Sequence, residues 1–132
     1  MKLITRDTDY ALRAICAIAR QKKQRIPVSL LTRQLEIPRA FLRKILQVLQ
    51  KKGVLDSSKG IGGGFVLAKP VNKIFLVDLI EIFQGPLQLN ECFFKKMACP
   101  NTNSCILKKK VDRIGDYVVR QLKEISVASL LR

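Results

Sequence analysis

The sequence predicts a mainly α fold with one small β-hairpin, followed by a long C-terminal helix. Apolar residues recur at helical spacing in several segments. Two short apolar runs flank the glycine-rich residues 59–64, which is typical of a hairpin. The chain has 132 residues, of which 48% are hydrophobic, so we expect one domain-sized unit whose elements are separated by proline and glycine.

The first expected helix covers residues 7–20. Its apolar residues share one face, which we expect to be buried: Tyr10, Ala11, Ala14, Ile15 and Ile18. Arg6, Arg13 and Arg20 fall outside that face, and Cys16 lies in or beside the core.

A helix-turn-helix is expected next. Ser29 is a plausible N-cap for a short helix that ends before the turn at residues 36–38. The second helix covers residues 39–52, and its apolar stripe comprises Phe41, Leu42, Ile45, Leu46 and Leu49. The opposite face carries Arg39, Arg43, Gln47 and Gln50.

A hairpin and a further helix complete this part of the chain. Gly53 ends the preceding helix, and residues 54–57 and 65–67 can pair as strands around a glycine-rich wing. Residues 76–84 form a helix that Gly85 and Pro86 stop. Residues 1–86 are therefore predicted to form a winged helix-turn-helix domain.

A long helix begins near residue 106, after a cysteine-bearing loop at residues 87–105. Its apolar residues repeat mainly every three or four positions: Leu107, Val111, Ile114, Val118, Leu122 and Ile125. This stripe could pack on its own domain or on a second copy. We favour a homodimer, in which residues 106–132 form the dimerisation helix and tail, because a dimer suits palindromic DNA.

The composition of the chain limits the binding partners and the reactions that we expect for it. The formal net charge of +15 attracts polyanions, with nucleic acid first among them. No apolar run is long enough to span a bilayer, and the N-terminal residues do not resemble a secretory signal, so we expect no membrane partner and a cytoplasmic location. The chain has no histidine, and no convergent acid, base and nucleophile is evident, so we expect no enzyme.

Basic residues concentrate on the helix-turn-helix, where Glu36 is the one acidic residue between positions 20 and 52. A solvated helical face would explain charge alone, but the helix-turn-helix spacing favours a helix that enters the major groove. The wing could hold phosphate or enter a minor groove, or its glycines could simply close a hairpin. The candidate DNA contacts are Ser29, Arg33, Arg39, Arg43, Lys44, Lys59, Gly60, Gly62 and Gly63. A winged-helix RNA binder is an alternative.

Three cysteines, Cys92, Cys99 and Cys105, are near-evenly spaced in a polar stretch, which favours a metal or cluster site over ordinary core thiols. The spacing does not separate zinc from an iron–sulfur cluster, and unligated redox thiols are the alternative. The fourth ligand must come from outside the loop. Cys16 lies on an apolar helix face, so a carboxylate is more attractive.

Residues 41–68, together with Thr8-Asp9-Tyr10-Ala11-Leu12-Arg13 and the cysteine loop, resemble the Rrf family of bacterial regulators, in its IscR/NsrR-like, cluster-binding branch. The resemblance covers nearly the whole chain. It implies a winged-helix dimer, joined through the C-terminal helix, that represses or activates promoters. We expect a repressor that senses redox state, nitric oxide or iron–sulfur status.

The same resemblance implies which residues hold the cluster. Cluster-binding members use three loop cysteines, which fall on Cys92, Cys99 and Cys105. One group adds a histidine where this chain has Lys108, whereas another takes an aspartate from the first helix, which matches Asp9. Asp9 is therefore the expected fourth ligand, with a four-iron cluster favoured and a two-iron cluster left open.

Two departures limit what the resemblance implies. The first gap between the cysteines is one residue longer than usual, and Arg43 and Lys44 replace a Glu-Gln pair on the recognition helix. The operator sequence is therefore not carried over. The alternative function is a cofactor-free, CymR-like regulator that is controlled by a protein partner.

Overall fold

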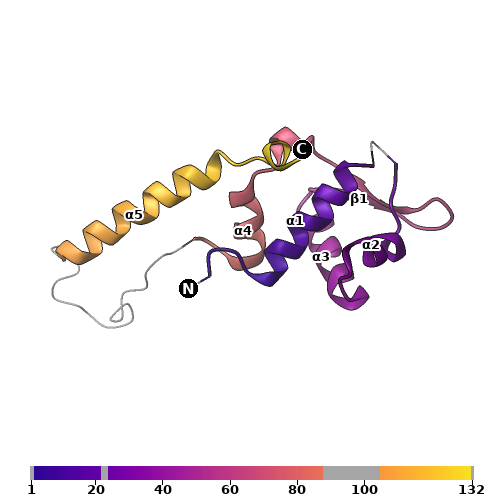
Figure 1. Ribbon diagram of the computed structural model, residues 1–132, viewed down its shortest axis with the longest axis horizontal. Helices are drawn as coiled ribbons and strands as arrows, with labels where there is room; N and C mark the ends of the chain where they lie inside the picture. The colour runs from indigo at the N-terminus through magenta and orange to yellow at the C-terminus, as the bar shows by residue number, and fades with distance from the viewer. Residues whose placement is uncertain (1, 22–23, 88–104, 132) are drawn as a thin grey trace.

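The computed structural model describes residues 2–21, 24–87 and 105–131 and confirms a mainly helical winged-helix fold (Figure 1). Its one sheet among these residues is a two-stranded antiparallel hairpin. The elements in chain order are α1 (Arg6–Ala19), α2 (Val28–Leu35), α3 (Arg39–Lys51), β1 (Leu55–Ser58), β2 (Gly64–Leu67), the 3₁₀ turn η1 (Val71–Lys73), α4 (Leu76–Gln84), α5 (Ile106–Lys123) and α6 (Val127–Leu130).

Helix α1 lies at the centre of the body and contacts α2, α3, α4, β2 and α6. The predicted buried face is confirmed at Ala11, Ala14, Ile15 and Ile18, while Tyr10 packs half-buried against it. Small alanine side chains on this face let neighbouring elements approach closely. The hydrophobic core is therefore built around α1.

Helix α2 begins two residues earlier than an N-cap at Ser29 requires, so that prediction is wrong. Pro27 occupies the N-cap position, and its carbonyl accepts the N–H groups of Leu30 and Leu31 at 3.1 and 3.2 Å. The fixed φ of proline suits this entry to a helix. Ser29 instead lies exposed in the first turn.

Helix α3 buries Leu42, Ile45, Leu46 and Leu49, as its stripe predicts. Phe41 was predicted to be part of that stripe, but it is 43% exposed. The Arg6 guanidinium lies over its ring, 4.8 Å from the ring centre, so a cation–π contact from α1 replaces burial.

The wing is tied to the segment that precedes α2. Ile26 and Phe65 exchange both backbone hydrogen bonds, at 3.0 and 2.9 Å. Gly64 lies against the Ile26 carbonyl, and a Cβ at this position would collide with that backbone. Glycine is therefore required where the hairpin meets the helix-turn-helix.

Helix α4 has the predicted bounds and ends at Gly85, whose φ is 80°. Its last residue, Gln84, joins it to the start of α1. The Gln84 Oε1 accepts hydrogen bonds from the Thr5 N–H at 3.0 Å and the Thr8 hydroxyl at 2.6 Å. The Gln84 Nε2 donates to the Leu3 carbonyl at 3.2 Å.

Helix α5 extends away from the body, and its C-terminal end contacts α4 (Figure 1). Leu122 is its buried residue, whereas Leu107 and Ile114 are 69% and 57% exposed. None of the helices in the described ranges is long and apolar enough to cross a membrane.

The chain turns back after α5, so the prediction that Ile125 extends the helix is wrong. The Ile125 carbonyl accepts the Leu76 N–H at 2.9 Å, and the Val127 N–H donates to the Ile74 carbonyl at 2.8 Å. These bonds end the helix and bring α6, with fully buried Val127, into the core around α1.

Candidate nucleic-acid interface

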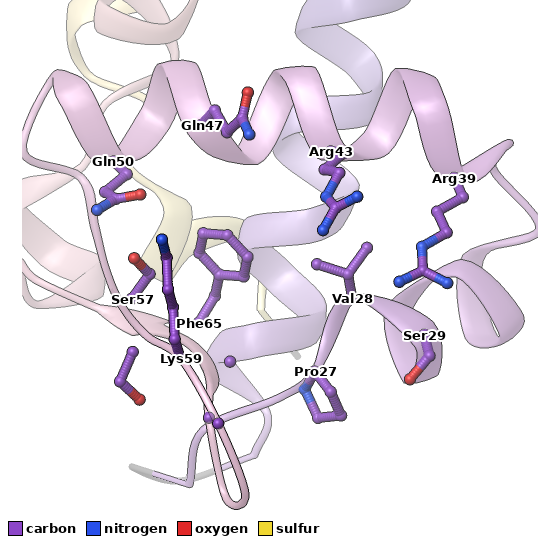
Figure 2. Close-up of a pocket in the computed structure, with 14 residues that line it drawn as sticks. Pro27, Val28, Ser29, Arg39, Arg43, Gln47, Gln50, Ser57, Lys59 and Phe65 are labelled. Atoms are coloured by element: carbon purple, nitrogen blue, oxygen red, sulfur yellow. The ribbon is translucent and has the colours of Figure 1, made fainter.

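A groove runs between α3 and the wing and is closed at one end by the start of α2 (Figure 2). Its lining residues are Pro27, Val28, Ser29, Arg39, Arg43, Gln47, Gln50, Ser57, Ser58, Lys59, Gly60, Gly63, Gly64 and Phe65. No acidic side chain is among these described residues, so three cationic side chains set the charge of the groove.

Helix α3 supplies a row of polar side chains along one face. Arg39, Arg43 and Gln47 are four residues apart, which places them on successive turns, and Gln50 continues the row. Figure 2 shows Arg39 and Arg43 pointing toward the start of α2. Guanidinium and amide groups of this kind can bond guanine and adenine edges in a major groove.

The wing supplies the facing wall. Lys59 extends from it in the direction of α3 (Figure 2). The Gly60 carbonyl accepts the Gly63 N–H at 3.0 Å, which closes a turn at the tip. The Gly63 amide is therefore used inside the turn and does not bond a phosphate in this conformation.

Six of the predicted contact residues line the groove: Ser29, Arg39, Arg43, Lys59, Gly60 and Gly63. Arg33, Lys44 and Gly62 lie outside its lining, and all three are exposed. The sequence prediction missed the two glutamines of the row as contact residues. It places Gln47 and Gln50 on the same face as Arg39 and Arg43 but selects contacts on that helix by charge, so the helical spacing was the available signal.

The family model described as Rrf2, an iron-dependent transcriptional regulator, matches residues 4–132. The chain belongs to the Rrf2 family. Rrf2 proteins are DNA-binding transcriptional regulators, which confirms the expectation of a regulator and not an enzyme.

Known proteins similar to this Rrf2 chain agree with that assignment. A protein of Aquifex aeolicus named as an HTH-type transcriptional regulator is 32% identical over 124 residues, which cover 92% of this chain and 86% of the relative. The structure of CymR, the global cysteine regulator of B. subtilis, has a TM-score of 0.82 at 20% identity, with 98% and 96% of the two chains covered. T. potens IscR has a TM-score of 0.75 at 18% identity, with 98% and 85% covered. These two structures show that the fold is shared.

Two of the predicted cluster ligands, Cys92 and Cys99, lie outside the described residues. Cys105 is the N-cap of α5, where its Sγ accepts the Lys108 N–H at 3.5 Å. The side chain of Lys108 bonds the Asp112 carboxylate at 2.7 Å.

Asp9, the predicted fourth ligand, lies near the start of α1 and forms an ion pair with the Arg13 Nε at 3.0 Å. Within one chain the first turns of α1 and α5 lie well apart (Figure 1). Across residues 2–21, 24–87 and 105–131, no three cysteine or acidic side chains lie close enough together to hold a metal ion.

Cys16 is half-buried and packs against the core. Burial raises the pKa of the Cys16 thiol, and the positive charge of Arg20 offsets part of that rise. The neutral thiol of Cys16 is therefore favoured.

Proposed function

We propose that this Rrf2 regulator is a homodimeric repressor that binds palindromic double-stranded DNA and responds to the state of an iron–sulfur cluster. The observation that supports the DNA contacts best is the groove between α3 and the wing, where Arg39, Arg43 and Lys59 converge without an acidic neighbour among the lining residues.

In this proposal α3 enters the major groove. Arg39 and Arg43 contact bases, and Ser29, Arg33 and Lys44 contact the backbone on either side. The wing, with Lys59, Gly60, Gly62 and Gly63, lies on phosphate or in the adjacent minor groove.

The exposed stripe of α5 is the proposed dimer contact. Leu107, Val111 and Ile114 follow one face of a helix that leaves the body, whereas Val118, Leu122 and Ile125 pack its base against α4. Burial of these apolar side chains by a second copy would stabilise the dimer, because it removes them from water.

We propose that the chain divides by function into a DNA-binding segment (residues 1–86), a cluster segment (87–105) and a dimer segment (106–132).

Cys92, Cys99 and Cys105 are the proposed thiolate ligands, with the Asp9 carboxylate as the fourth. The described donors fit such a group, because the Cys105 sulfur and the Asp9 carboxylate both lie partly exposed and are atom types that iron accepts. Because the starts of α1 and α5 lie apart in one chain, Asp9 would come from the partner subunit of the dimer.

An iron–sulfur cluster would supply a centre that reacts with oxidants or nitric oxide. The chain supplies the connection to the rest of the molecule, because Cys105 caps the helix proposed to join the two subunits. A change at Cys105 therefore acts directly on the first turn of α5.

Anaerobic purification with absorption spectroscopy and iron and sulfide analysis tests the proposal. We expect a coloured dimer whose iron and sulfide content matches a four-iron cluster rather than a two-iron cluster. Cys92→Ala and Asp9→Asn should each lower cluster occupancy, whereas the matched variants Cys16→Ala and Asp7→Asn should not.

DNA binding is measured on the same preparations. Loss of the cluster should change the affinity for a duplex selected from a random pool, as reported by fluorescence anisotropy. A colourless anaerobic preparation that binds the duplex with unchanged affinity would contradict the proposed cluster. It would favour the alternative, in which a protein partner controls the regulator.

A further inference from the structure

The tip of the wing carries an isoleucine that has no structural role in the free chain. Ile61 is fully exposed, whereas the next most exposed large apolar side chains among the described residues, Ile106 and Leu107, lie on α5 and are 69% exposed. An isolated apolar residue on a surface is ordinary. Ile61 differs from such residues because it lies at the tip of the wing.

Ile61 is held at the apex of a defined turn. The Gly60–Gly63 hydrogen bond closes the turn, and Gly60 and Gly62 have φ values of 91° and 76°, which glycine adopts freely. Strand pairing fixes the base of the turn through Ser58 and Gly64. The Ile61 side chain therefore lies at the apex of the turn and is open to solvent in the free chain.

This turn belongs to the proposed DNA interface. Gly60 and Gly63, on either side of Ile61, line the groove with Arg43 of α3, and the hairpin projects beyond the helices (Figure 1). With α3 in a major groove, a wing beside it meets the neighbouring minor groove. A tip made of glycine backbone and one side chain is slim enough to enter that narrow groove.

The chemistry of the minor groove decides what Ile61 would select. Adenine–thymine pairs present only acceptors there, whereas guanine adds a 2-amino donor. An apolar side chain over that amino group removes it from water and offers no acceptor, which is unfavourable. Over adenine–thymine pairs, the same side chain packs on sugars and the groove floor, and no hydrogen-bond donor is left without an acceptor.

We infer that Ile61 enters the minor groove beside α3 and makes the regulator prefer adenine–thymine pairs there, because it excludes the guanine 2-amino group. The inference rests on the proposed placement of α3 and the wing on DNA. It assigns to the wing a part of the sequence selectivity that phosphate contacts from Lys59 cannot supply.

Selection from a random duplex pool, run in parallel with the wild-type dimer and Ile61→Ala, tests this inference. Both proteins should enrich the same core sequence, read by α3, but only the wild type should enrich adenine–thymine pairs beside it. On a duplex with those flanks, Ile61→Ala should bind about tenfold more weakly, and Ile61→Leu should restore the affinity. The thermal midpoint should not change, since Ile61 is fully exposed.

Base analogues isolate the amino group. Replacing flanking guanine with inosine, which lacks the 2-amino group, should raise wild-type affinity to that of adenine–thymine flanks. Replacing flanking adenine with 2,6-diaminopurine should lower it, and neither change should affect Ile61→Ala. Lys59→Gln should weaken binding to all of these duplexes while keeping the discrimination.

Discrimination that persists in Ile61→Ala would overturn the role of Ile61 and leave DNA binding through α3 intact. Failure of both proteins to enrich any sequence would overturn the proposed DNA contacts and this inference together.

Discussion

Arg43 lies in the middle of the polar row on α3, between Arg39 and Gln47. Replacing it with alanine should weaken binding to the selected duplex by about 10- to 100-fold, because a bidentate base contact contributes about 1–3 kcal/mol of discrimination. Binding to a scrambled duplex should fall much less. Fluorescence anisotropy titrations at several salt concentrations measure both quantities.

Arg120→Ala is the matched control for Arg43→Ala. It removes the same charge from an exposed position on α5, far along the chain from the groove residues. Equal losses for the two variants would mean that Arg43 contributes only to net charge.

Cys16 should react slowly with alkylating reagents. Burial raises the pKa of its thiol, so the thiolate fraction at a mildly alkaline pH is smaller than in the unfolded chain. By linkage, the contribution of Cys16 to stability is present below the unfolded pKa and is lost as the pH rises through the folded pKa. Mass spectrometry after iodoacetamide treatment at pH 8 should show slower modification of Cys16 in native than in urea-unfolded protein, and equal rates would contradict the assignment.

At the level of whole elements, Gln84 holds the end of α4 to the start of α1. Thr8 is fully buried, and its hydroxyl bonds Gln84. Gln84→Ala should therefore lower the free energy of unfolding by about 1–3 kcal/mol, because it leaves a buried hydroxyl without this partner. Urea denaturation of the regulator measures the loss.

Two further variants separate the hydrogen bond from general effects of the substitution. Gln34→Ala, at an exposed position of α2, should leave the unfolding free energy almost unchanged. Thr8→Val removes the hydroxyl at similar volume. In a protein that already carries Thr8→Val, Gln84→Ala should therefore lower the free energy of unfolding by less than it does in the wild type. Full additivity of the two changes would show that the bond contributes nothing.

The bounds of most elements could be predicted from sequence because periodicity, proline and glycine act locally. The face of α1, the stop at Gly85 and the hairpin all follow from neighbouring residues. Phe41 could not be placed this way, because its partner Arg6 comes from a different helix. The same holds for Ile26, whose pairing with Phe65 joins distant segments.

Some residues of the groove could be identified from the sequence, and others could not. Arg39 and Arg43 could be identified because charge and helical spacing agree. Gln47 and Gln50 were on the predicted face but carry no charge, and only the facing wing places them in the groove. The proposed cluster ligands lie far apart in the chain, so no local pattern could join Asp9 to Cys105.

For the whole molecule, the exposed stripe of α5 should determine the oligomeric state. Ile114 is 57% exposed in the single chain, and Ile114→Glu would place a charge in the proposed dimer contact, where burial without a partner is costly. We expect monomers in sedimentation experiments, with the helical content of the winged body retained, and much weaker binding to a palindromic duplex.

Arg120→Glu introduces the same side chain on the polar face of α5. It should leave the dimer intact. If Ile114→Glu also stays dimeric, the subunits meet elsewhere and α5 covers its apolar face in another way.

The return of α6 to the centre of the body has a consequence for biosynthesis. Val127 packs in the core around α1 and is translated after every other buried residue of that core. On the ribosome, α1 and the helix-turn-helix emerge long before this side chain, so the core around α1 stays incomplete until synthesis has passed α5. Packing of the core around α1 is therefore completed only after α6 has been translated.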